Sequence, residues 1–240
     1  MKPAFIISMY DEHAFVKQSI DRIVKVFPDS TIVVVHSHNG MDFAYDGSKN
    51  IHYLKLSDLA KTVSRYSLPS SAICRNFSAG FLRLYEIEAD HDLIVALTGD
   101  TLVTDAASFN RRLLDLRSRD KSAAVSQAVG QLFHADSDNP ELGIVGGRPQ
   151  NEDTTDFACC LFMILGDVAR AKGAFTDIKI TNQYTSEQCL GDELMRVLDV
   201  YNGQDFHSKV IRLNEKFPRE AYSYSDGITY HARTNGAPGR

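Results

Sequence analysis

A single carboxylate, that of Asp100, follows a short apolar run in the sequence ALTGDTLVT, residues 96–104. Residues 93–97 are apolar, which predicts a buried strand that ends at Thr98 and Gly99. An aspartate in such a turn commonly bonds to nearby backbone amides. A carboxylate oxygen is also the ligand that Mg²⁺ and Mn²⁺ prefer. Two roles are therefore open for Asp100, a turn residue or a ligand of a divalent cation.

Two more apolar runs, residues 5–9 and 31–35, also end in polar residues. Neither shows strict alternation of polar and apolar residues, which is typical of strands covered on both faces. Between them, apolar residues recur three and four positions apart over 15–27, and this pattern predicts an amphipathic helix. The order strand, helix, strand favours a right-handed βαβ unit. Because ligands bind beyond the carboxyl ends of the strands in such sheets, we expect the polar strand ends to share one site.

The rest of the chain supplies the elements that complete such a fold. The patterns predict strands at 51–56 and 157–165, and helices at 73–87, 167–172 and 192–201. Residues 134–156 are rich in Asp, Asn, Gly and Pro, and we expect them to form loops. Residues 221–240 are polar, and we expect a mobile tail there.

The composition is that of an ordinary globular protein, with 43% apolar and 24% charged residues. A net charge of -5 argues against nonspecific nucleic-acid binding, which needs a basic face, so we expect no nucleic-acid partner. The first apolar run is too short for a signal peptide or a membrane span, and we expect a cytoplasmic protein with no integral membrane segment. The four cysteines include no CxxC pair, which indicates reduced, mostly buried thiols.

In their order along the chain, these segments resemble the nucleotide-sugar glycosyltransferases of the GT-A fold, and among them the family-two-like group. MYDE, residues 9–12, and HSHN, residues 36–39, stand where that family has its Pro-x-Tyr-Asn-Glu and Asp-Asp-Gly-Ser loops. An Arg-Asn pair at 75–76 matches the family's pair before the metal motif. HDLIVALTGDTLV, residues 91–103, stands in the place of the hydrophobic strand and the Asp-x-Asp motif. GDELMRVL, residues 191–198, is similar to the family's Glu-Asp-x-x-Leu helix start.

The resemblance implies a GT-A-like α/β fold, a mixed sheet flanked by helices, in a single domain over 1–240. Residues 1–104 would form the nucleotide-binding half and 105–220 the acceptor-side half. It also implies an enzyme that moves a sugar from a nucleoside-diphosphate donor to a hydroxyl acceptor, with inversion and with Mg²⁺ or Mn²⁺ as cofactor. Such a cation neutralises charge on the leaving diphosphate. The donor-binding residues that the resemblance implies are Met9, Tyr10, Asp11, His36, Ser37, Arg75, Asn76, Thr98, Gly99 and Asp100.

Two departures from the family's pattern bear on the metal and on the donor. Thr98 stands where the metal motif has its first Asp, so Asp100 is the motif's remaining carboxylate. His231, in ITYHART, is a candidate second metal ligand, because some family members complete the site with a histidine near the C-terminus; the alternative is a surface histidine. His36 and Ser37 replace the acidic pair that contacts the base in the family, which leaves the donor base open.

Asp192 and Glu193 are the candidate general bases. An inverting transfer needs a carboxylate that takes the proton from the attacking hydroxyl. The resemblance aligns Asp192 with the family's base, and Glu193 stands beside it. The alternative for Asp192 is a helix cap, because the free amides and the dipole of a first turn stabilise an Asp there. Arg75 likewise has two open roles, a phosphate contact or a structural residue.

Two other functions remain open. A noncatalytic relative that binds a sugar nucleotide or a protein would fit the replacement of the first metal Asp by Thr98. A nucleotidyltransferase on a similar sheet is the second alternative, but the Gly-rich basic loop of those enzymes is absent between Ser8 and His13.

Overall fold

The chain begins with two crossover units that build one half of a sheet. The computed structural model describes residues 2–9, 12–37, 45, 50–56, 68–87, 90–99, 101–103, 124–126, 161–179, 186–199, 210–212, 223–225 and 229–232. The elements of the two units are β1 (Pro3–Met9), α1 (His13–Val26), β2 (Thr31–His36), β3 (Ile51–Lys55), α2 (Leu68–Ile87) and β4 (Leu93–Thr98). All of these elements occur where the apolar patterns predict them.

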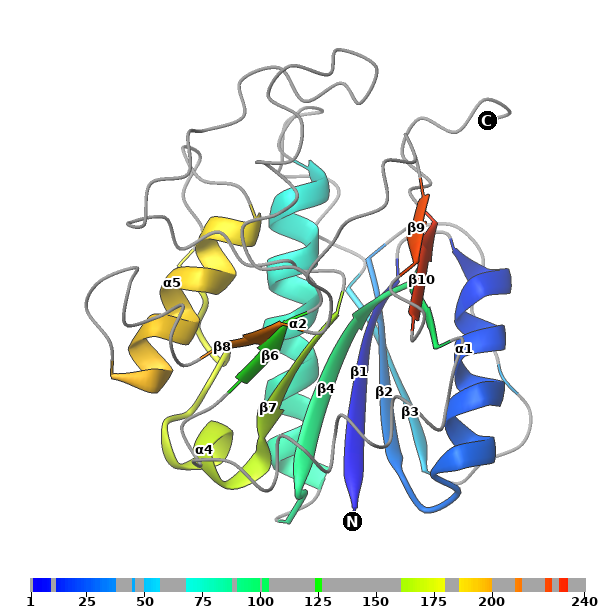
Figure 1. The fold of residues 1–240 in the computed structure, drawn as a ribbon, viewed down its shortest axis with the longest axis horizontal. Helices are drawn as coiled ribbons and strands as arrows, with labels where there is room; N and C mark the ends of the chain where they lie inside the picture. The colour runs from blue at the N-terminus through cyan, green and yellow to red at the C-terminus, as the bar shows by residue number, and fades with distance from the viewer. Residues whose placement is uncertain are drawn as a thin grey trace.

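The main sheet is mixed. Within the described residues it has seven strands in the order β3-β2-β1-β4-β7-β6-β8 (Figure 1). The first four strands along the chain run parallel to one another. Strand β7 (Leu161–Leu165) pairs antiparallel with β4, and β6 (Ala124–Ser126) and β8 (Val210–Arg212) extend the sheet beyond it. The predicted fold class, a mixed α/β sheet flanked by helices, is confirmed.

A second, smaller sheet adjoins the end of β4. Strand β5 (Thr101–Val103) pairs antiparallel with β10 (Thr229–Ala232), which pairs in turn with β9 (Ser223–Ser225). The Ser19 hydroxyl of α1 donates to the Thr101 carbonyl at 2.6 Å and so fixes β5 against α1. Within the expected mobile tail over 221–240, residues 223–225 and 229–232 are strands of this small sheet, with β10 paired to β5 and β9 paired to β10.

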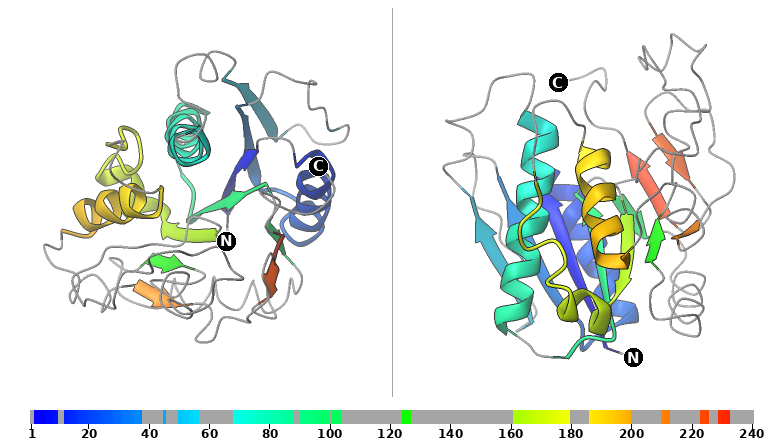
Figure 2. Two further views of the ribbon diagram at one scale, coloured as in Figure 1. Left: turned by 90° about the horizontal axis from the view of Figure 1, so that it is seen from above. Right: turned by 90° about the vertical axis from the view of Figure 1, so that its left-hand side faces the viewer.

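Helices cover both faces of the main sheet, as the view from above shows (Figure 2). One face packs against α1 through one set of alternate strand residues, among them Phe5 and Ile7. The other face packs against α2 and α5 (Ser186–Leu198) through the opposite set, among them Ala4 and Ile6. Strands β1, β2 and β4 are thus buried on both sides, which explains their apolar runs without alternation.

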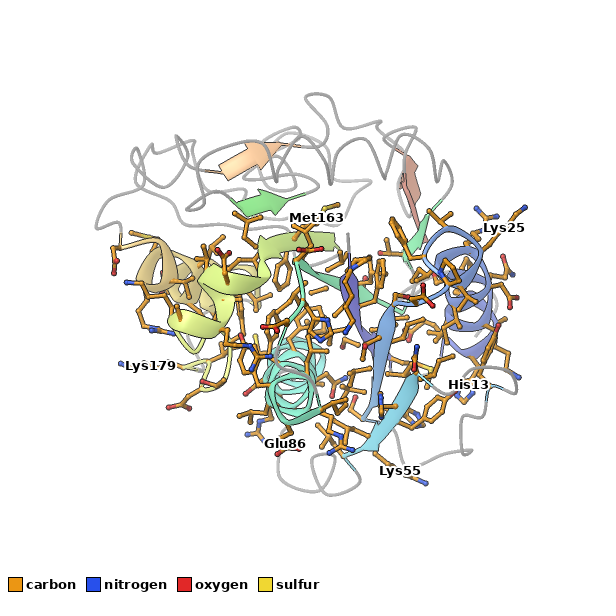
Figure 3. The ribbon with its side chains drawn as sticks, turned by 90° about the horizontal axis from the view of Figure 1, so that it is seen from below. His13, Lys25, Lys55, Glu86, Met163 and Lys179 are labelled. Atoms are coloured by element: carbon orange, nitrogen blue, oxygen red, sulfur yellow. The ribbon has the colours of Figure 1, made fainter. Side chains whose placement is uncertain are left out.

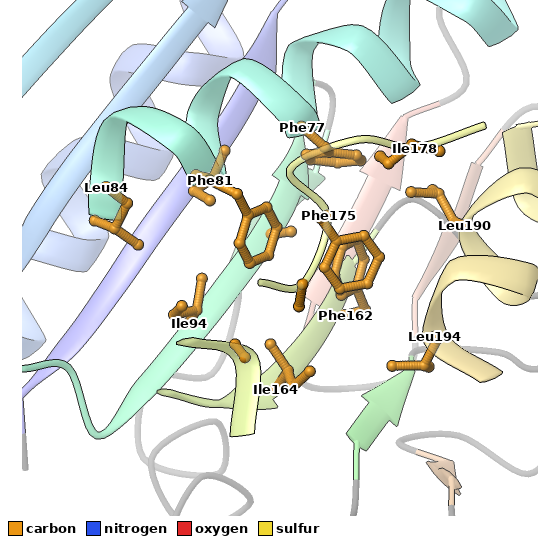
Figure 4. Close-up of a cluster of buried hydrophobic side chains, with 14 of the residues drawn as sticks. Phe77, Phe81, Leu84, Ile94, Phe162, Ile164, Phe175, Ile178, Leu190 and Leu194 are labelled. Carbon is orange, nitrogen blue, oxygen red and sulfur yellow. The ribbon is translucent and has the colours of Figure 1, made fainter. Parts of the chain in front are cut away.

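Aromatic rings form the centre of the core under α2 and α5 (Figure 4). Phe81 stacks on Phe175 with ring centroids 4.7 Å apart, and Phe162 lies 5.1 Å from Phe175. Phe175 is held in a left-handed backbone conformation, with φ of 60°. A bulky residue adopts this conformation only where its surroundings over-determine it, and the stacked rings are one part of those surroundings.

Several charged side chains lie on the outside of this fold. Figure 3 shows Lys25, Lys55, Glu86 and Lys179 pointing away from the sheet and helices. No helix within the described part of the chain is apolar over a stretch long enough to cross a membrane. Cys74 and Cys189 are buried free thiols, as expected for these two cysteines.

Candidate functional site

The ends of β1, β2 and β4 lie side by side at one edge of the sheet. Met9 is paired with His36, and Ser8 with Thr98. The ladders continue just past the strands, because the Gly99 N–H donates to the Ser8 carbonyl at 2.7 Å and the Ser37 N–H donates to the Met9 carbonyl at 3.2 Å. The structure thus brings the described members of the predicted donor site together at one edge. Tyr10, Asp11, Asp100 and residues 38–39 lie outside the described residues.

The start of α1 adds two groups to this edge that the sequence reasoning did not single out. Glu12 precedes the helix but makes no capping hydrogen bond with its side chain. Its carboxylate turns toward the end of β4: a Cβ atom added at Gly99 would lie 2.9 Å from Glu12 Oε2. The His13 ring meets the buried His36 ring edge to face, with centroids 5.6 Å apart. The signal for Glu12 was present in the sequence, as the last residue of MYDE.

The turn after β4 is built on threonines. The Thr98 and Thr101 hydroxyls are hydrogen-bonded to each other at 3.0 Å, and both residues are buried. The Thr98 hydroxyl therefore serves the turn, and Asp100 is the residue between Gly99 and Thr101. His231 in β10 is the register partner of Thr101, so the backbone positions next to Asp100 and at His231 are neighbours. The side chain of His231 is outside the described part of the structure.

Asn76 and Arg75 approach the edge from α2 in different ways. Asn76 is buried, and its Nδ2 donates to Ser8 Oγ at 3.0 Å and to Ser37 Oγ at 3.3 Å. Arg75 is partly exposed on the same helix. The amide of Asn76 thus contacts strand-end residues, while Arg75 is only partly buried.

Helix α5 begins earlier than the apolar pattern predicts. It starts at Ser186 rather than at Asp192, which places Asp192 well inside the helix. A capping role for Asp192 is therefore wrong, because its neighbouring backbone amides are in the middle of a helix and not in a first turn. The pattern failed here because the first turns of α5 carry few apolar residues. Asp192 is exposed.

Glu193 is in a different environment from its neighbour. It is buried, with Oε1 accepting hydrogen bonds from the Phe175 N–H at 2.8 Å and from Arg196 Nη2 at 2.7 Å. Its second oxygen, Oε2, accepts from Arg196 Nε at 2.9 Å. The carboxylate in turn raises the pKa of the Arg196 guanidinium above its ordinary value. Oε1 of Glu193 therefore holds the segment after α4 (Gly166–Ala171) against α5, and Oε2 is bonded to Arg196 of the same helix.

Arg196 and α2 complete the support of that segment. Arg196 donates to the carbonyls of Lys172 and Gly173, and Tyr85 of α2 donates its hydroxyl proton to the Ala174 carbonyl at 3.1 Å. Burial raises the pKa of the Tyr85 phenol. These contacts stabilise the left-handed turn at Gly173, whose φ is 56°, and the one at Phe175.

Comparison with known proteins identifies the architecture around this edge. No protein-family model matches the chain, and no curated protein is significantly similar to it. Among solved structures, Staphylococcus aureus TarS 1–349 is similar over 97% of this chain and 60% of its own, with 11% identity and a TM-score of 0.51. TarS is a GT-A glycosyltransferase. This chain has a GT-A-like fold.

Two other GT-A glycosyltransferases show the same likeness at lower scores. The mannosyltransferase PcManGT from Pyrobaculum calidifontis was solved with GDP-Man and Mn²⁺. Its alignment covers 88% of this chain and 54% of PcManGT, with 13% identity and a TM-score of 0.49. The galactosyltransferase LgtC was solved with donor and acceptor sugar analogues. Its alignment covers 90% of this chain and 74% of LgtC, with 16% identity and a TM-score of 0.42. The chain thus spans less than two thirds of TarS 1–349 and of PcManGT.

The GT-A-like edge has donors that suit a divalent cation. Within the described side chains no cluster of three or more His, Cys, Asp or Glu residues could hold a metal ion. The Glu12 carboxylate near Gly99 is a hard oxygen ligand, Asp100 is the next residue in the chain, and the backbone of His231 is the register partner of Thr101. Mg²⁺ and Mn²⁺ are commonly bound through one or two carboxylates together with substrate phosphates. The residue types therefore fit such an ion.

Proposed function

We propose that this protein is a glycosyltransferase that moves a sugar from a nucleoside-diphosphate donor to a hydroxyl acceptor, with inversion and with a divalent cation. The observation that carries the proposal is the convergence of the ends of β1, β2 and β4 on one edge of a GT-A-like sheet, with Asp100 two residues after the end of β4. Fold alone does not define an activity. The polar groups at this edge supply the chemical argument.

The donor would bind at the edge with its diphosphate near Gly99. Asp100 would hold the cation, with His231 as the candidate second ligand, and Arg75 would offer a positive charge to the phosphates. When bound, the cation neutralises the negative charge that develops on the leaving diphosphate. His36 and Ser37 would lie toward the nucleoside, and neither brings the acidic side chain typical of family-two-like enzymes to that position.

The acceptor would need a base to take its proton as it attacks the anomeric carbon. Of the two candidates, we favour Asp192, because its carboxylate is exposed to solvent. Glu193 is the weaker candidate, because both of its oxygens accept hydrogen bonds and its charge is paired with Arg196. We therefore assign Glu193 to the support of α5 rather than to proton transfer.

The first experiment is a hydrolysis assay with a panel of UDP- and GDP-sugars in the presence of Mn²⁺ or Mg²⁺, comparing the wild type with Asp100→Asn. We expect metal-stimulated hydrolysis of at least one donor and its loss in the variant, because the amide removes the anionic ligand. Calorimetric titration of the matching nucleoside diphosphate should show the same loss of metal-stimulated binding. The melting temperature should stay close to that of the wild type. Unchanged metal dependence in Asp100→Asn would contradict the role of this residue.

One observation favours a second candidate function, that of a noncatalytic relative that binds a sugar nucleotide. The Thr98 hydroxyl, in the place of a metal carboxylate, is bonded to Thr101 instead. Calorimetric binding of a nucleotide sugar without hydrolysis or transfer to any acceptor would support this alternative over the enzyme.

A further inference from the structure

Asn76 lies inside the protein where α2 passes the ends of β1 and β2. The residue is 1% exposed, and its Nδ2 donates hydrogen bonds to the hydroxyls of Ser8 and Ser37 at 3.0 and 3.3 Å. Ser8 belongs to β1, and Ser37 directly follows β2. One side-chain amide thus joins two neighbouring strand ends to one helix.

A glycine one helical turn further along α2 brings Asn76 this close to the strands. Gly80 lies on the same face of the helix, four residues on. A Cβ atom added at Gly80 would lie 2.3 Å from Ile6 Cγ2 and 3.3 Å from Val35 Cγ2. Helix α2 therefore packs directly on the Ile6 and Val35 side chains of β1 and β2, with no side chain of its own at this point. The short Asn side chain can reach hydroxyls on both strands because the helix is so near.

The hydrogen bonds of Asn76 reinforce the last rung of the β1–β2 ladder. At this level the Ser37 N–H donates to the Met9 carbonyl at 3.2 Å, and Met9 is paired with His36. The Asn76 Oδ1 atom is buried and accepts no hydrogen bond from the described residues. The contribution of Asn76 therefore lies in its two N–H donations, which tie the two strand ends to α2.

We propose that Asn76 is a positioning residue for donor binding rather than a donor-binding residue itself. Its burial keeps the amide from direct contact with a ligand, so it acts through Ser8 and Ser37. It fixes the spacing of the two strand ends, at Met9 on β1 and at His36 and Ser37 on β2, and the proposed function places His36 and Ser37 toward the nucleoside of the donor. The statement about the donor rests on that proposed function, whereas the statement about strand spacing does not.

The statement that Asn76 sets the spacing of the strand ends is tested by amide hydrogen exchange, measured by NMR in the absence of any ligand. In Asn76→Ala we expect the Ser37 amide to exchange about tenfold faster or more relative to amides in the middle of β1, because two hydrogen bonds at the strand ends are lost. The matched control is Ser78→Ala, two residues away on α2. It removes a hydrogen bond of 2.8 Å to the Thr176 carbonyl, which ties α2 to a different segment.

Equal Ser37 exchange in Asn76→Ala and Ser78→Ala would overturn the positioning role. Two milder variants, Ser8→Ala and Ser37→Ala, each remove one of the hydroxyls and make the same comparison if Asn76→Ala does not fold. We expect each of them to speed exchange at this strand end less than the Asn76 variant does. No acceleration in either would also overturn the proposal.

The statement that Asn76 supports donor binding is tested by calorimetric titration of UDP and of GDP, each with Mn²⁺. For the nucleotide that the wild type binds, we expect affinity to fall about tenfold in Asn76→Ala and to be retained in Ser78→Ala. Faster exchange with unchanged affinity would overturn the link to the donor. If the wild type binds neither nucleotide, the donor assignment of the proposed function fails, and the exchange data still decide whether Asn76 sets the strand spacing.

Discussion

Two adjacent carboxylates show how environment separates residues that look equivalent in sequence. Asp192 is exposed on α5, whereas Glu193 is buried and bonded to Phe175 and Arg196. A carboxylate with both oxygens engaged and its charge paired is poorly suited to take a proton. The pair GDEL could be aligned to a family motif, but the sequence did not reveal which carboxylate had a structural partner, because Phe175 lies far from it in the chain.

The same pair gives a prediction that separates catalysis from stability. Asp192→Asn should lower turnover about 100-fold or more, within the usual range for loss of a general base, with little change in melting temperature. Glu193→Gln should lower the free energy of unfolding by about 1–3 kcal/mol, because it removes a charge-assisted hydrogen-bond acceptor from a buried site. Turnover is measured with a donor that the wild type hydrolyses, and stability by urea unfolding.

The opposite pattern would contradict the assignment. A large loss of turnover in correctly folded Glu193→Gln, with near-normal turnover in Asp192→Asn, would make Glu193 the base. Normal turnover in both variants would place the base elsewhere.

Asn76 shows the same limit of sequence reasoning at the donor edge. The Arg-Asn pair was expected to bind the donor, and the structure buries Asn76 against two serines from separate strands. The sequence predicted that these residues meet at one edge, because β1 and β2 are consecutive parallel strands. It could not predict which of them would be covered by the helix.

At the scale of elements, the apolar periodicity of the sequence predicted the helices and strands whose apolar faces pack in the core. The helices α1 and α2 and the four parallel strands were predicted because each carries a strong apolar pattern. The start of α5 was missed because its first turns carry few apolar residues. The strands β9 and β10 were missed because they are short and polar, and because their sheet depends on the pairing of β10 with β5, which is distant in sequence.

The contact between α2 and the sheet gives a prediction at this scale. Gly80→Ala should lower the free energy of unfolding by about 1–3 kcal/mol, because the added methyl overlaps Ile6 and forces the helix away from β1 and β2. This loss should exceed the gain of about 1 kcal/mol that alanine brings to a helix interior. Urea unfolding measures the difference.

The matched control for Gly80 is Leu82→Ala on the exposed side of the same helix, where Leu82 is 45% exposed. We expect its effect to stay within about 0.5 kcal/mol, as for surface substitutions generally. A stabilised Gly80→Ala protein would show that α2 can move away from the strands at no net cost in stability.

At the scale of the whole molecule, the order of strands creates the candidate site. The chain passes from β1 to its neighbours β2 and β4 on either side, so three strand ends meet at one edge. The small sheet then brings β10, from near the C-terminus, to the residue after Asp100. The GT-A-like class was predicted from the order of motifs, but the small sheet was not, because pairings between distant segments leave little local signal.

The most direct test of a metal and donor site at this edge is paramagnetic broadening by Mn²⁺ in an NMR spectrum of the protein with bound UDP or GDP. The account predicts that the amides of Gly99, Thr101 and His231 broaden first, because they flank Asp100 in the chain or across the small sheet. The amides of His91 and Leu93, at the opposite end of β4, should stay sharp, and Mg²⁺ in place of Mn²⁺ should broaden none of them. Broadening centred on His91 and Leu93, or none with nucleotide bound, would contradict the account.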